Sequence, residues 1–139
     1  LDSMQAIVLL EKLKLYKSFI KKRYSAAKYY KKYIDTNLNE IKVLLNFNQK
    51  VNICTNFPIL LKKRNLFISF MKDKGVEIGK NYPFPLYKQQ TFKKFSNNFS
   101  FKNADYISKS IATLPINPFI TRKEQDYILN CLNEFNKTF

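Results

Sequence analysis

Histidine is absent from this 139-residue sequence, and only two glycines and two cysteines are present. Without histidine the chain lacks the commonest general base and metal ligand of proteins, which excludes an ordinary zinc site. Cys54 and Cys131 stand alone, without the spacing of a metal or redox motif, and we interpret both as reduced structural residues. The ten carboxylates are scattered and form no catalytic pair. On residue chemistry alone, the sequence does not describe an autonomous enzyme.

Long apolar runs are missing as well. No stretch approaches the roughly 18 to 20 apolar residues of a membrane span, and no signal peptide opens the chain. We therefore expect a cytoplasmic protein without a membrane partner. Hydrophobic residues make up 45% of the chain and aromatic residues 16%, which is ample apolar surface for one packed core.

Acidic residues are few, so the formal net charge is +15. Such a balance raises the possibility of nucleic-acid binding. However, only three of the 25 basic residues are arginine, and the abundant Lys, Asn, Ile, Phe and Tyr all have AT-rich codons. No known nucleic-acid motif is present either. We interpret the charge as compositional and do not expect specific nucleic-acid binding. A basic module that binds polyanions stays as an alternative.

Residues 1–34 predict one long linking helix, because apolar residues recur three or four apart. Asp2 is the expected N-cap. Residues 6–10, "AIVLL", are apolar on every face of this helix although they lie near the chain end. We therefore expect self-association through residues 4–20. The apolar face is formed by Ala6, Leu9, Leu13, Ile20, Tyr24, Ala27 and Ile34.

Residues 35–139 are predicted to form a small α+β domain. Strands are expected within 39–47 and 51–60 and at 76–78, with a helix at 63–75 that ends at Gly75. A short helix capped by Asn103 should precede an extended segment, and Thr121 with Glu124 should cap a terminal helix. The predicted order is thus helix, β-β-α-β, loop, α, α, with a sheet of about three strands. Helical spacing places five aromatic residues in the core: Tyr16, Tyr24, Phe67, Phe70 and Tyr127.

Residues 74–90, "KGVEIGKNYPFPLYKQQ", contain both glycines and two of the five prolines. This stretch resembles the "GIxTGxHYPxPLHxQ" loop of the DegT-type sugar aminotransferases, which depend on pyridoxal phosphate. Three further blocks resemble the same family in order. They are "LDSMQAIVLLEKL" at 1–13, "NFPILLKKRNLFISFMKDKG" at 56–75 and "NADYISKSIATLPINPFIT" at 103–121.

The resemblance implies a fold like the C-terminal small domain of fold-type I aminotransferases, with the large domain absent. In the intact family an amino group moves from glutamate to a nucleotide-linked keto-sugar. The Schiff-base lysine and the pyridoxal phosphate site belong to the family's large domain, so we expect this chain to bind no cofactor and to have no activity alone. The expected partner is a large-domain polypeptide of a split aminotransferase. The alternative to such a role, besides the polyanion module, is a non-functional remnant of a split gene.

The same resemblance indicates the candidate site. Two histidines of the family's loop are replaced by Asn81 and Tyr87, and the first of these positions lies near the sugar-nucleotide substrate in relatives. The candidate substrate-binding residues are therefore Asn81, Tyr82 and Gln89, with no catalytic residue in this chain. Asparagine can hydrogen-bond a substrate but carries no proton at neutral pH. Alternatively, Tyr82 and the loop prolines only fix the loop against the sheet.

Overall fold

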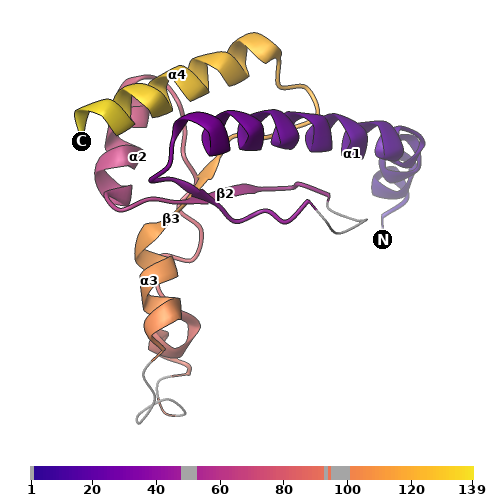
Figure 1. Cartoon of the computed structure of the whole chain (residues 1–139). Coiled ribbons are helices and arrows are strands. Elements are labelled where there is room, and N and C mark those ends of the chain that lie inside the picture. The colour runs from indigo at the N-terminus through magenta and orange to yellow at the C-terminus, as the bar shows by residue number, and fades with distance from the viewer. Residues whose placement is uncertain (1, 48–52, 93, 95–100) are drawn as a thin grey trace.

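A computed structural model shows a long helix lying over a small antiparallel sheet (Figure 1). The structure describes residues 2–47, 53–92, 94 and 101–139. Helix α1 spans Ser3–Asn37 and α4 spans Arg122–Thr138. These two helices lie side by side on the same side of the sheet, and α2, Arg64–Asp73, lies at one end. The segment that contains the short helix η1, Leu86–Lys88, and helix α3, Lys102–Ser110, extends away from this body as an arm.

The sheet has the order β1-β2-β3 and is antiparallel throughout. Its strands are β1, Lys42–Val43, β2, Phe57–Leu60, and β3, Ile111–Leu114. Phe57 pairs with Leu114, so the apolar residues that precede α2 and follow α3 meet in the centre of the sheet. The α+β class and the three-strand sheet are confirmed. Strands lie within both predicted regions, 39–47 and 51–60, and residues 51 and 52 of the second region are outside the described residues.

The third strand differs from the prediction. Residues 76–78 form no strand, and Gly79 only makes an isolated bridge to Thr113. The third strand is instead β3, within the segment that we predicted only as extended. Three residues of alternating polarity cannot by themselves show whether a neighbouring strand will pair with them.

The helix ends follow local capping chemistry. The Asp2 carboxylate accepts a hydrogen bond from the Met4 N–H at 3.0 Å, as predicted, and α1 continues to Asn37. The capping box of Thr121 and Glu124 is also present at the start of α4. The prediction for Asn103 is wrong, because Asn103 lies inside α3, which begins after Phe101 without a side-chain cap.

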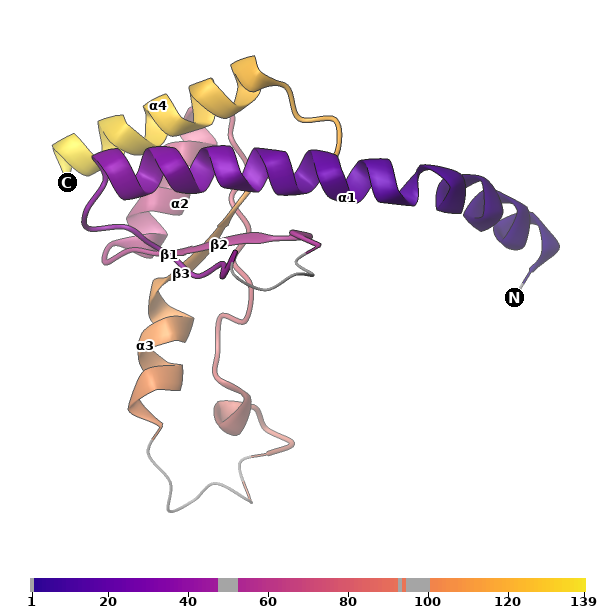
Figure 2. The same ribbon diagram turned by 45° about the vertical axis from the view of Figure 1, so that its right-hand side comes forward.

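The core lies between the sheet, the C-terminal half of α1, α2 and α4. Phe67 is fully buried, and Tyr24 and Phe70 pack partly buried against the core. The core prediction is wrong for Tyr16 and Tyr127, which are 45% and 50% exposed. Tyr16 lies on the N-terminal half of α1, which extends beyond the body (Figure 2). Helical spacing identifies the apolar side of a helix, but does not show where along the helix that side is covered.

Two buried thiols complete the core: Cys54 and Cys131 are both buried, and burial raises the pKa of Cys54. None of the described helices is long and apolar enough to cross a membrane. Within the described ranges, no group of three or more acidic or cysteine side chains could hold a metal ion.

Candidate functional site

A cleft of about 780 Å³ lies beside residues 79–81. One wall comes from residues within 75–81, and the other from β3, the segment that follows it and the first turns of α4. Buried Val76, Leu114 and Ile128 are among the apolar residues that line it. The polar side chains at the cleft are mainly amides and hydroxyls: Thr55, Asn56, Asn81, Thr113, Asn117 and Tyr127.

Gly79 brings its segment close to β3. Its N–H donates to the Thr113 carbonyl at 3.0 Å, and the Thr113 N–H donates back to the Gly79 carbonyl at 2.9 Å. A Cβ atom at position 79 would lie 3.2 Å from the Thr113 Cβ, so a side chain there would crowd the strand. Two residues later, the Asn81 amide donates to the Thr113 hydroxyl oxygen at 3.1 Å. Thr113 therefore holds both the backbone and the side chain of this edge of the cleft.

The three candidate residues do not converge on the cleft. Asn81 lines it, whereas Tyr82 and Gln89 are not among its lining residues. Tyr82 is 79% exposed and has a φ of 53°, a left-handed conformation that is uncommon for tyrosine. Gln89 is exposed and follows η1, where its N–H donates to the Leu86 carbonyl at 3.1 Å. The backbone thus turns at Tyr82 and directs the next residues into the arm.

Tyr87, at the position of the second replaced histidine, connects the η1 segment of the arm to α3. Its hydroxyl donates to one carboxylate oxygen of Asp105 at 2.7 Å, and the Lys88 ammonium lies 2.6 Å from the other. The Tyr87 ring also packs against Phe101, with ring centroids 5.0 Å apart. Hydrogen bonds from Lys88, and to a smaller extent from Tyr87, lower the pKa of Asp105. The Asp105 carboxylate in turn raises the pKa of both Tyr87 and Lys88. We call these three residues, Tyr87, Lys88 and Asp105, the arm latch.

The cleft can bind polar groups but is poorly equipped to move protons. The Glu124 carboxylate accepts hydrogen bonds from the Thr121 N–H at 2.7 Å and from its hydroxyl at 2.8 Å. These bonds lower the pKa of Glu124, so it caps α4 as a carboxylate instead of acting as a base. The Tyr127 hydroxyl is used as a donor to the Lys74 carbonyl at 2.8 Å.

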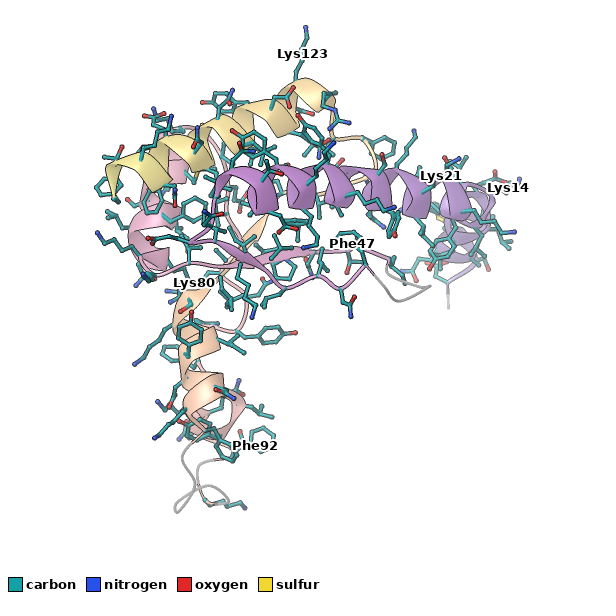
Figure 3. All side chains as sticks on the ribbon, viewed as in Figure 1. Lys14, Lys21, Phe47, Lys80, Phe92 and Lys123 are labelled. Carbon is teal, nitrogen blue, oxygen red and sulfur yellow. The ribbon has the colours of Figure 1, made fainter. Side chains whose placement is uncertain are left out.

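The cleft residues do not fit pyridoxal phosphate. That cofactor requires a lysine that forms a Schiff base within an enclosed site, an acid beside the pyridine nitrogen and a cradle for the phosphate. The lysine at this cleft is Lys123, which is exposed and extends away from α4 (Figure 3). The acidic residues at the cleft are Glu77 and Glu124, and Glu124 is committed to the helix cap. We therefore derive no cofactor chemistry from this cleft.

Some residues of the site were not found by sequence reasoning. The sequence predicts only an extended segment at Thr113, yet Thr113 forms hydrogen bonds with both Gly79 and Asn81. The pairing of Asp105 with Tyr87 joins residues 18 positions apart through the projecting arm. The periodicity of apolar residues along the chain does not indicate contacts between segments that are distant in sequence.

Comparisons with known proteins agree with this architecture. The sequence model of the DegT/DnrJ/EryC1/StrS aminotransferase family matches residues 1–133. The chain is 24% identical over 135 residues to the dTDP-3-amino-3,6-dideoxy-alpha-D-galactopyranose transaminase of Aneurinibacillus thermoaerophilus, covering 97% of this chain and 36% of that protein. It therefore spans about a third of the length of that relative.

Solved structures match the fold over nearly the whole chain. S. venezuelae DesV, in complex with a ketimine intermediate, matches with a TM-score of 0.91 at 20% identity, covering 100% of this chain and 38% of that one. A DegT DnrJ EryC1 StrS aminotransferase from Brucella abortus matches with a TM-score of 0.85 at 23% identity, covering 98% and 36%. These structures share the fold of this chain. The match of the family's sequence model over residues 1–133 shows that the chain belongs to the DegT/DnrJ/EryC1/StrS aminotransferase family.

Proposed function

We propose that this chain is the C-terminal part of a cytoplasmic, pyridoxal-phosphate-dependent nucleotide-sugar aminotransferase of amino-sugar and polysaccharide biosynthesis. The family match over residues 1–133, with coverage of only about 36% of a relative's length, carries the proposal. The name of the Aneurinibacillus relative, which describes a transaminase for a dTDP-linked amino sugar, supports the substrate class. We propose further that the chain binds no cofactor and is inactive alone.

The cofactor site and its Schiff-base lysine would come from a large-domain polypeptide, which we propose as the functional partner. When bound there, pyridoxal phosphate supplies the amino-group transfer. The role proposed for this chain is to position substrate. The Asn81 amide donates to Thr113, which leaves its carbonyl oxygen as an acceptor for a substrate hydroxyl. Tyr82 and Gln89 would offer exposed polar groups from the base and the middle of the arm.

Reductive trapping tests the inactivity of the isolated chain. The purified chain is mixed with stoichiometric pyridoxal phosphate, reduced with borohydride and mapped by mass spectrometry. We expect weak labelling spread over many surface lysines, because an exposed amine such as that of Lys123 has no special affinity for the cofactor. Stoichiometric labelling of one lysine would contradict the proposed division of labour.

A chimera tests whether this chain positions substrate when a large domain is present. This chain replaces the matching third of the Aneurinibacillus transaminase, and cofactor absorbance reports whether the chimera assembles before transamination of a dTDP-linked keto-sugar is measured. We expect measurable activity that Asn81→Ala lowers about tenfold, the loss of one hydrogen bond to substrate. Asn130→Ala, an exposed asparagine on α4, is the matched control. An assembled chimera in which Asn81→Ala matches the control would remove Asn81 from the site.

A further inference from the structure

Arg64, the first residue of α2, is a buried cation that takes no part in the cleft. Within the part of the chain that the structure describes, it is the only charged residue that is buried, with 6% of its surface exposed. Burial lowers the pKa of its guanidinium, because the charged form loses hydration. None of the described carboxylates forms an ion pair with it. Its place at the N-terminus of α2 is also unfavourable, since the positive end of the helix dipole lies there.

The hydrogen bonds of Arg64 lead to the arm. Its Nη1 atom donates to the Ser108 carbonyl in the last turn of α3. Its Nε atom donates to the side-chain oxygen of Asn65 at 3.1 Å, and Asn65 is exposed. The last carbonyls of a helix have no partner within the helix and form the negative end of its dipole. The buried cation is therefore stabilised by α3 and not by its own helix.

A second contact joins α3 to the body at the same end. The Leu61 N–H, in the connection between β2 and α2, donates to the Ser110 carbonyl at 3.1 Å. Helix α3 then continues directly into β3 (Figure 1). The angle of α3 sets the direction in which the arm leaves the body, and Arg64 holds the last turn of α3 at that angle.

From α3 the contacts continue to the segment that contains Gln89. Asp105, one turn before Ser108, forms the arm latch with Tyr87 and Lys88. Gln89 follows the latch directly, and its N–H donates to the Leu86 carbonyl at 3.1 Å. The place of Gln89 thus depends on two links in series, one from Arg64 to α3 and one from α3 to η1.

We propose that Arg64 is a positioning residue for substrate binding, which fixes the direction of the arm through α3 and thereby the place of Gln89. This role rests on the function proposed above, in which Gln89 offers a polar group to the substrate. Arg64 is too deeply buried to touch the substrate and acts through α3. Arginine suits such a role better than lysine, because its planar guanidinium bonds Ser108 and Asn65 together and is fixed in its plane.

Kinetics of the chimera described above test this role. Arg64→Met keeps a long unbranched stem in the core and removes every donor. We expect the KM for the dTDP-linked keto-sugar to rise about tenfold, the factor that corresponds to one lost hydrogen bond, while kcat stays within about twofold. Arg64→Lys keeps one donor for the Ser108 carbonyl, so its KM should lie closer to that of the unchanged chimera. The matched control, Lys109→Met, removes an exposed cation from the last turn of the same helix and should change neither constant.

A merely structural role of Arg64 gives a different result. Lower stability reduces the amount of folded chimera, which lowers the apparent kcat and leaves KM unchanged. That result with Arg64→Met would overturn the proposal. So would a rise in KM with Lys109→Met that equals the rise with Arg64→Met, since loss of any positive charge near α3 would then explain the effect.

Spin labels on the 139-residue chain test the direction of the arm without any activity. One label is placed at Gln90→Cys on the arm and the other at Asn130→Cys on α4, both exposed positions, whereas the native cysteines are buried. We expect a broader distribution of label distances in Arg64→Met than in Lys109→Met. If Arg64→Met is unfolded by circular dichroism, Arg64→Lys takes its place in the same comparison. Equal distributions would overturn the proposal. An inactive chimera together with the expected broadening would refute the proposed function and still support the role of Arg64 in directing the arm.

Discussion

Gly75 offers a quantitative test of why this chain places a glycine two residues after the end of α2. Its φ is +75°, and its N–H donates to the Lys72 carbonyl at 2.9 Å while the next N–H, of Val76, reaches the Met71 carbonyl at 2.8 Å. These bonds end the helix in the manner of a left-handed C-terminal glycine. A Cβ atom at position 75 would meet nothing within 4 Å. The cost of a side chain here is therefore conformational and not steric.

For Gly75→Ala we expect a loss of about 1 kcal/mol in the free energy of unfolding. The left-handed conformation costs an L-residue about 1–2 kcal/mol, and alanine offsets part of this by restricting the unfolded chain. Asparagine tolerates this region better, so Gly75→Asn should lose less. Urea unfolding followed by circular dichroism measures both as a lower midpoint with an unchanged slope.

Position 79 provides the matched contrast. The φ of Gly79 is outside the left-handed region, but its Cβ would lie 3.2 Å from the Thr113 Cβ. Gly79→Ala should therefore lower the free energy of unfolding only a little if β3 yields by a few tenths of an ångström. The larger side chain of Gly79→Asn should lower it more, which is the reverse of the order expected at Gly75. A conformational role for Gly75 is refuted if Gly75→Ala has the wild-type urea midpoint, or if Gly75→Asn has a lower midpoint than Gly75→Ala.

Three further predictions concern the arm, the last helix and the surface charge. The pKa of Asp105 is lowered in the folded chain, so the arm latch should contribute its full stability above about pH 4, near the unfolded pKa of an aspartate, and lose it as the pH falls through the folded value. The protection of the backbone amides of residues 80–92 against hydrogen exchange, taken relative to the intrinsic exchange rate at each pH, should then fall at acid pH, and in Tyr87→Phe this protection should be lower already at neutral pH. Thr121→Ala removes the α4 cap and should lower the free energy of unfolding by about 1 kcal/mol, whereas a wild-type urea midpoint would show that the capping box is dispensable. Binding to DNA or RNA should be weak, independent of sequence and abolished by moderate salt in fluorescence titrations; tight, sequence-selective binding at physiological salt would favour the polyanion module.

The residues that act through near neighbours were predicted correctly from the sequence. The Asp2 cap, the capping box of Thr121 and Glu124, and the end of α2 at Gly75 depend on backbone groups within a few positions, so their spacing is sufficient to predict them. The long first helix and the α+β class follow from apolar periodicity. The order of four family-like blocks indicated an aminotransferase family, which the match over residues 1–133 then showed. The boundary between residues 34 and 35 as a domain division stays a prediction.

Only the tertiary structure decided which segments meet. It selected residues 111–114 as the third strand, because β pairing depends on a partner far away in the chain and not on the strand's own residues. It placed Asn81 at the cleft through Thr113, and separated Tyr82 and Gln89 from that cleft by a turn into the arm. Periodicity gives a helix its apolar side, whereas exposure along that side depends on what packs there. For this reason Tyr30 is fully buried and Tyr16, on the same side of α1, is 45% exposed.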